Sequence, residues 1–132
     1  MKFVSNTDKQ EANKQIVVAS YDAMLNKHDI EAATQHFGAN YKQHNPTAPD
    51  GIDGFKPFFA AYIKQYPNSS VTIKRVLADG DFVVMHVHLL LNPEERGRAA
   101  AEIFRLEGGK IVEHWDVIQA IPEKANNSNM MF

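Results

Sequence analysis

The sequence predicts an α+β fold in which N-terminal helices pack on a curved antiparallel sheet. The chain has 132 residues, 44% of them hydrophobic, which is enough for one compact core and a single domain. Apolar residues recur every three or four positions up to Tyr66, which is typical of helices. After Ser69 they recur every second position, which is typical of strands. Helices therefore come first and a meander of strands follows, an order that favours helices covering one sheet face.

Three helices are expected before Ser69. The first begins at 7–10, where Thr-Asp-Lys-Gln has the form of a capping box. Asp29 is a second N-cap candidate and opens a short helix that reaches Phe37 and ends at Gly38. The third carries a series of aromatic residues at spacings of three and four, with Pro57 expected in its first turn. Core packing is the more frequent role of such a series. Its members are Phe55, Phe58, Phe59, Tyr62 and Tyr66.

Four long strands are expected at 71–77, 82–91, 99–106 and 110–121. The glycine-containing turns between them are of the kind that closes hairpins. A short extra strand is expected near 41–44. Residues 122–132 are rich in Asn and lack periodicity, so we expect a mobile tail after an ordered core of about 8–121.

Composition excludes several classes of function. The chain has 14 Lys and Arg against 16 Asp and Glu, so it lacks the basic surface that nucleic acids or anionic membranes would require. It has no cysteine, which rules out disulfides, thiolate nucleophiles and cysteine-bound metal centres. No apolar run is long enough for a signal peptide or a membrane span. We therefore expect a cytoplasmic protein with no nucleic-acid or membrane partner.

Three blocks of sequence carry a resemblance to a known family. They are Tyr-Lys-Gln-His-Asn-Pro at 41–46, Glu-Ile-Phe-Arg-Leu at 102–106 and Gly-Lys-Ile-Val-Glu-His-Trp-Asp-Val at 109–117. These blocks resemble the signature blocks of the SnoaL-like polyketide cyclase family. That family belongs to the nuclear transport factor 2-like superfamily, together with ketosteroid isomerase and scytalone dehydratase. The resemblance covers about 11–121 and implies a cone-shaped fold with a pocket.

The resemblance also implies a chemistry. In the family's cyclases, a carboxylic acid at the position of Glu102 and a histidine at the position of His88 are expected to move protons on a carbonyl substrate. The usual Asp is Glu here, and the extra methylene displaces the carboxyl group by about 1.5 Å, which affects the choice of substrate. Burial disfavours the charged form of such an acid, which could then act as base or as donor. We expect a cofactor-free enzyme that cyclises, isomerises or dehydrates an apolar carbonyl compound.

The turn between the last two strands decides what lies beside Glu102. A three-residue loop, 107–109, would place Glu102 beside His114. A two-residue loop, 108–109, would place it beside Trp115 instead. We prefer the three-residue loop because it gathers the polar residues of both strands on one face. The residues predicted to contact substrate are His44, His114, Asp116, Phe104, Phe59 and Tyr62.

A metal site is a weaker interpretation. His86 and His88 share one strand face, as metal ligands do in several sheets, and Gly80 with these two histidines matches the start of the cupin pattern. The match fails at Asn92 and Pro93, where a cupin would have Glu, so we expect no metal.

Two further hypotheses concern partners. The strand face opposite His88 is apolar from Val83 to Leu91, which is too much apolar surface to leave in water. A homodimer packed on the sheet is therefore expected, with covering by the C-terminal tail as the alternative. The fold also hosts proteins without chemistry, so a small-ligand carrier or a dimeric interaction module is the alternative to an enzyme.

Overall fold

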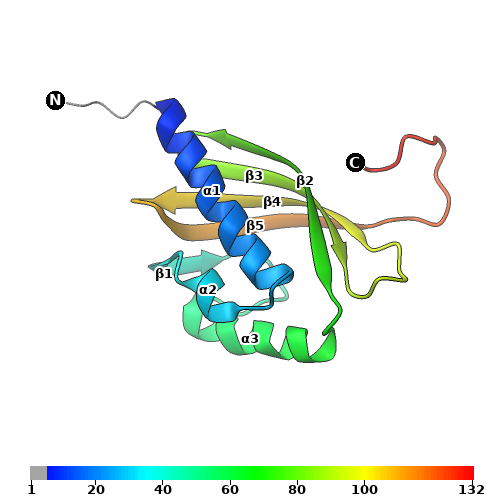
Figure 1. Cartoon of the computed structure of the whole chain (residues 1–132), viewed down its shortest axis with the longest axis horizontal. Coiled ribbons are helices and arrows are strands. Elements are labelled where there is room, and N and C mark those ends of the chain that lie inside the picture. Colours follow the sequence, from blue (N-terminus) through cyan, green and yellow to red (C-terminus); the bar gives the residue numbers. More distant parts are fainter. Residues whose placement is uncertain (1–5) are drawn as a thin grey trace.

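The computed structural model describes residues 6–132, which form three helices and five strands (Figure 1). The helices are α1 (Asn6–Leu25), α2 (Ile30–Thr34) and α3 (Gly51–Gln65), and the strands are β1 (Phe37–Gln43), β2 (Ser70–Asp79), β3 (Phe82–Leu90), β4 (Arg98–Glu107) and β5 (Lys110–Ala120). Residues 1–5, part of the stretch in which no signal peptide is expected, lie outside the described residues. Within 6–132, no helix combines the length and the apolarity that crossing a bilayer requires.

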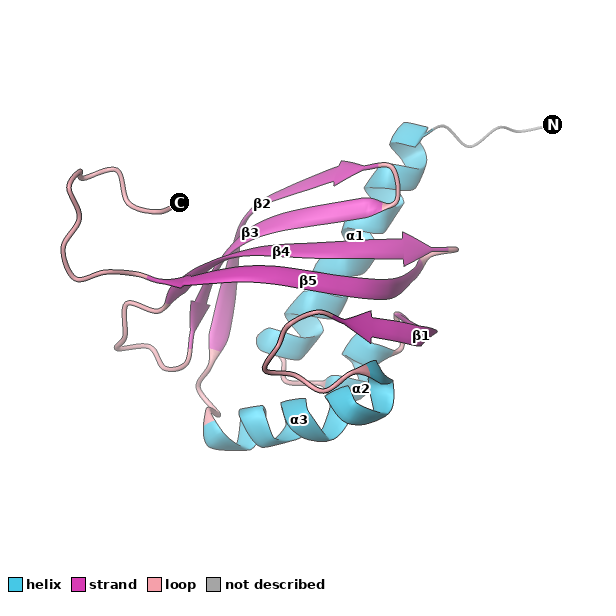
Figure 2. Cartoon of the chain, turned by 180° about the vertical axis from the view of Figure 1, so that it is seen from behind, coloured by secondary structure: helices cyan, strands magenta, loops and turns pink. Residues whose placement is uncertain are grey.

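The sheet has the strand order β1-β5-β4-β3-β2. Neighbouring strands from β2 to β5 are antiparallel, and β1 adds a parallel edge beside β5. The helix α1 runs across one face of the curved sheet, while α3 lies at its end below β1 (Figures 1 and 2). The predicted α+β class, with N-terminal helices on a curved antiparallel sheet, is confirmed. Pairing with β5 explains why the short extra strand begins at Phe37, earlier than expected.

The core lies between α1 and the sheet. Val83, Met85 and Val87 are fully buried on the sheet face that α1 covers, and Val17 of α1 is fully buried as well. This is the face that was expected to stay open and pack against a second copy. That expectation is wrong, because α1 removes the apolar side chains of β3 from water.

Two details of the helices differ from expectation. Asp29 caps α2 as predicted, its carboxylate accepting from the Ala32 amide at 3.0 Å, but α2 ends at Thr34 rather than near Gly38. Pairing of Phe37 with Ile111 draws the chain into the sheet first. Pro57 lies inside α3 rather than in its first turn, although a proline there removes a helical hydrogen bond. The aromatic residues of α3 offset this cost by packing into the core.

Gly97 allows the chain to enter β4 and is a sensitive position. It has a positive φ of 79°, and a Cβ atom there would lie 2.2 Å from the carbonyl oxygen of Leu89. We expect Gly97→Ala to lower the free energy of unfolding by about 2 kcal/mol or more, since backbone strain and a clash add together. Gly108→Ala is the matched control, because Gly108 also has a positive φ but a Cβ there meets nothing within 4 Å. Chemical denaturation of both variants tests this, and equal losses would contradict it.

Candidate active site

A turn and a bulge together place the polar residues of β4 and β5. Gly108 and Gly109 form a two-residue turn with positive φ at both positions, and Glu107 pairs with Lys110. The predicted three-residue loop is therefore wrong. A β-bulge between Arg105 and Leu106 then shifts the register of β4 against β5 by one residue, so Glu102 lies opposite Asp116. As a result, the polar residues of β4 and β5 lie on one face of the sheet, which is the arrangement expected from the longer loop.

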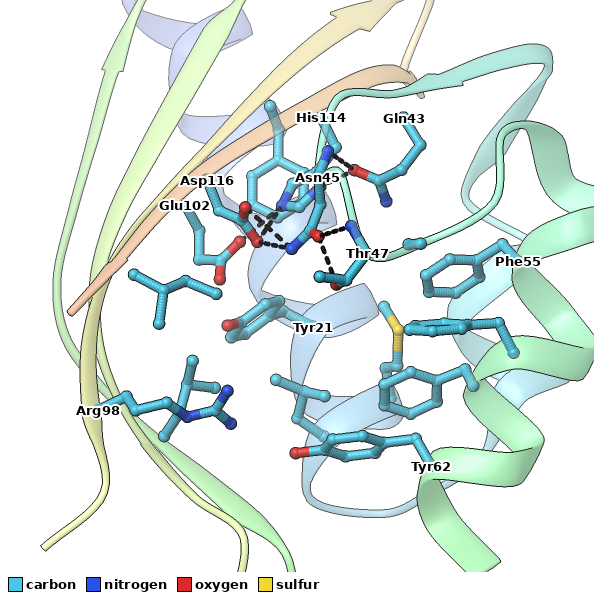
Figure 3. A pocket seen from close by; sticks show the side chains of 18 of the residues that line it. Tyr21, Gln43, Asn45, Thr47, Phe55, Tyr62, Arg98, Glu102, His114 and Asp116 are labelled. Atoms are coloured by element: carbon cyan, nitrogen blue, oxygen red, sulfur yellow. Dashed lines mark hydrogen bonds and ion pairs between the residues drawn. The ribbon is translucent and has the colours of Figure 1, made fainter. Parts of the chain in front are cut away.

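These side chains line a cavity of about 330 Å³ between the sheet, α1 and α3. Its wall is largely aromatic and aliphatic, with a few polar groups gathered at β4 and β5 (Figure 3). This combination is typical of small-molecule sites. The structure brings together six of the residues predicted from the sequence. They are Glu102, His114, Asp116, Phe104, Phe59 and Tyr62.

His114 is held in one tautomer by its neighbour on β1. The backbone amide of Asn45 donates to Gln43 Oε1 at 3.0 Å, which identifies that atom as the carbonyl oxygen of the side chain. His114 Nδ1 lies 2.7 Å from the same oxygen, so Nδ1 must carry a proton and donate it. The other ring nitrogen, Nε2, is thereby left for Glu102.

Glu102 and His114 form a buried pair that shares one proton. The distance from His114 Nε2 to Glu102 Oε2 is 2.6 Å, and the two side chains are 10% and 5% exposed. Two bare acceptors would repel each other at this distance, so a proton lies between them, on either the ring or the carboxyl group. The pair therefore holds a single proton at the wall of the cavity.

Asn45 orients the second carboxylate. Its Nδ2 donates to both oxygens of Asp116, at 3.0 and 2.9 Å, while its Oδ1 accepts from the amide and hydroxyl of Thr47 (Figure 3). Asp116 Oδ2 lies 3.9 Å from His114 Nε2. Asp116 is thus a second carboxylate held in a fixed orientation beside the pair.

Tyr21 contributes a hydroxyl group from α1. Its side chain is buried and points toward the polar cluster (Figure 3). Its oxygen makes no hydrogen bond of standard geometry among residues 6–132, although the Glu102 carboxylate lies close to it. Burial, followed by the nearby charge of Glu102, raises the pKa of this phenol well above its usual value. Tyr21 therefore stays protonated and can donate to a ligand oxygen placed in the cavity.

Two predicted site residues lie elsewhere. His88 is on the opposite face of the sheet from Glu102, because Met85, not His88, lies beside Glu102 in the β3–β4 register. Its Nε2 contacts the Arg96 carbonyl oxygen at 2.7 Å, and Phe132 packs on its ring. The expected pairing of His88 with Glu102 is wrong. His44 also lies outside the cavity.

His44 belongs to a surface cluster on the outer side of β5. Its ring stacks on Trp115 with 4.8 Å between centroids, and its Nε2 lies 2.6 Å from Glu113. Hydrogen bonding to His44, and then to Arg105, lowers the pKa of the Glu113 carboxyl group. His44 was predicted to contact substrate, but it does not line the cavity. It instead connects the end of β1 to the outer side of β5.

The polar cluster also has the composition of a cation site. Glu102, His114 and Asp116 each offer a ligand atom, and these atoms lie within 4.8 Å of one another. Carboxylate and imidazole ligands together suit divalent metals. Here the donors are already engaged with the shared proton and with Asn45, so a cation would have to displace that proton.

Sequence reasoning missed four residues that shape the cavity: Tyr21, Gln43, Asn45 and Arg98. Gln43 and Asn45 alternate with His44 and lie on the inner side of the chain, next to Asp116 and His114. Alternation alone could have separated them from His44. Tyr21 lies on the apolar face of α1, where a hydroxyl group requires a partner or a ligand.

Comparison with known proteins agrees with this architecture. The family model of the SnoaL-like domain matches residues 17–114. A search of curated proteins found no significant match.

Three solved structures illustrate the similarity of the fold. A SnoaL-like protein of unknown function from Burkholderia thailandensis E264 has a TM-score of 0.73 and 19% identity, covering 84% of this chain and 97% of its own. A protein from Kribbella flavida DSM 17836, provisionally named a ketosteroid isomerase, has a TM-score of 0.73 and 17% identity, covering 90% of this chain and 86% of its own. One from Bacillus cereus ATCC 10987, provisionally named a polyketide cyclase, has a TM-score of 0.72 and 22% identity, covering 87% and 78%.

Proposed function

Since the chain belongs to the SnoaL-like domain family, we propose that it is a small enzyme that moves a proton on an apolar carbonyl compound bound in the cavity. The observation that carries the proposal is the buried, single-proton pair of His114 and Glu102 at the cavity wall. In this proposal, His114 has the role in proton transfer that was predicted for His88.

The proposed step is an enolisation. Glu102, as a carboxylate beside protonated His114, removes a proton from the carbon next to the substrate carbonyl. The electrons of that C–H bond form a C=C bond, and the carbonyl electrons move to the oxygen, which becomes an enolate. Tyr21 donates a hydrogen bond to this oxygen, where negative charge develops. Return of the proton to another carbon would complete an isomerisation.

The same enolate allows two other outcomes. Attack of its carbon on a second carbonyl group would form a C–C bond, and the resulting alkoxide would take back the proton, as in an aldol cyclisation. Loss of water would then give a dehydration product. The shape of the cavity and the substrate, rather than the acid–base pair, decides among these outcomes.

Exchange of hydrogen for deuterium tests the proposal without knowledge of the natural substrate. Purified protein is incubated in D₂O with β-tetralone, a small ketone with an acidic C–H group, and incorporation of deuterium is followed by mass spectrometry. We expect incorporation faster than in buffer alone. Tight binding of ketones without exchange would instead support a carrier. Mass spectrometry of any compound that copurifies with the protein would identify the natural ligand.

We also propose that the protein is a homodimer that uses the outer face of the sheet. Val117, Leu77 and Phe82 on this face are 69%, 62% and 42% exposed, and Phe132 of the tail covers only the part near His86 and His88. Light scattering at micromolar concentration should give about twice 14.9 kDa, and Val117→Glu should lower it. A mass of 14.9 kDa for the unmodified protein would refute the dimer.

A further inference from the structure

Arg98 places a positive charge at the far end of the cavity. It lies on β4 four residues before Glu102, so the two side chains point to the same face about 13 Å apart along the strand. Figure 3 shows its guanidinium group directed into the cavity, with the hydroxyl group of Tyr62 pointing toward it from α3. The cavity therefore has two polar ends, separated by an apolar middle.

Among residues 6–132, no acidic side chain forms an ion pair with Arg98. Its Nε atom is buried and finds no hydrogen-bond acceptor among the same residues. Such an arrangement is costly unless a ligand supplies the missing acceptor. By contrast, Arg105 on the other face of β4 binds both Glu107 and Glu113.

Tyr62 completes this end of the cavity. Both side chains line the cavity, and the Tyr62 hydroxyl group points toward the Arg98 guanidinium group (Figure 3). Burial raises the pKa of the Tyr62 phenol, and the positive charge of Arg98 acts in the opposite direction. The carboxylate of Glu95 also acts on Tyr62, but it accepts from the backbone amide of Leu91 and forms no ion pair with Arg98. A guanidinium group and a phenol together offer several donors to one anionic group.

We propose that Arg98 and Tyr62 form a carboxylate-binding subsite, so that the ligand of this protein is a carbonyl compound carrying a carboxylate at the end remote from Glu102. The inference rests on the proposed function for the position of the carbonyl group. The subsite itself rests only on Arg98, Tyr62 and the cavity. The aromatic side chains of α3 line the space between the two ends and suit an apolar, ring-containing ligand body.

Three compounds test binding at the two ends of the cavity separately. Para-acetyl-phenylbutanoate carries a ketone and a carboxylate about 10 Å apart, given bonds of about 1.5 Å. Its amide, para-acetyl-phenylbutanamide, lacks the charge, and phenylbutanoate lacks the ketone. Binding is measured by titration calorimetry. We expect the unmodified protein to bind the keto acid about tenfold or more tightly than the amide, because a charged hydrogen bond is gained.

Arg98→Met removes the charge and keeps much of the side-chain length. We expect this variant to bind the keto acid and the amide equally, while Arg105→Met, the matched control on the outer face, retains the preference. Arg98→Lys should keep part of the preference, which shows that the fold survives substitution at this position. No preference in the unmodified protein, or an unchanged preference in Arg98→Met, would overturn the subsite.

Failure of the subsite can be distinguished from failure of the enzyme. Binding of phenylbutanoate that depends on Arg98, without exchange of the acetyl hydrogens of the keto acid in D₂O, would support the subsite and contradict the enzyme. Exchange that is equal for the keto acid and the amide, in the unmodified protein and in Arg98→Met, would contradict the subsite and support the enzyme.

Discussion

Glu102→Gln should lower the rate of ketone deuteration by about 100-fold or more, the usual contribution of a positioned acid or base. The amide keeps the size of the side chain but can neither take up nor release the proton. Folding should survive, because an amide is cheaper to bury than a charge and can still donate to the imidazole of His114. The rate is measured with β-tetralone in D₂O, and folding by thermal unfolding.

Glu107→Gln is the matched control for this substitution. Glu107 ends the same strand, but its side chain is exposed and paired with Arg105. It should leave the exchange rate unchanged. Equal rates for Glu102→Gln and the unmodified protein would remove Glu102 from the mechanism and return it to the role of a satisfied buried acid.

Tyr21→Phe should lower the same rate by about 100-fold, because one donor to the enolate oxygen is lost. The hydroxyl group makes no hydrogen bond of standard geometry among residues 6–132, although the Glu102 carboxylate lies close to it. The free energy of unfolding should therefore change little. This contrast between rate and stability distinguishes a donor to the ligand from a structural tyrosine. A normal exchange rate, or a marked loss of stability, would contradict the assignment.

The order of helices and strands could be predicted from periodicity, but the pairing around Glu102 could not. The turn at Gly108 and Gly109 has two residues, which alone would have placed Trp115 opposite Glu102. The bulge near Leu106 adds the residue that reverses the faces. Bulges depend on how neighbouring strands pack and twist, and alternation of residue types does not reveal them.

The position of His88 shows a second limit of the sequence. The loop before β4 is long, so it does not set the register between β3 and β4, and a shift of one residue exchanges the two faces of a strand. The residue types of β3 did indicate which of its faces is buried. The buried face is the uniformly apolar one, formed by Val83, Met85, Val87 and Leu89. The face that carries two histidines is the outer face. Glu102, His114 and Asp116 nevertheless share one face, because the bulge compensates for the shorter turn.

The proton between His114 and Glu102 carries the proposed chemistry, and nitrogen-15 and proton NMR of His114 locates it most directly. We predict that Nδ1 carries its own proton, as the contact with Gln43 requires, and that one further, strongly deshielded proton lies between Nε2 and the carboxyl group. The deshielded signal should be absent from Glu102→Gln. A His114 ring with an unprotonated Nδ1, or a pair without the shared proton, would contradict the mechanism.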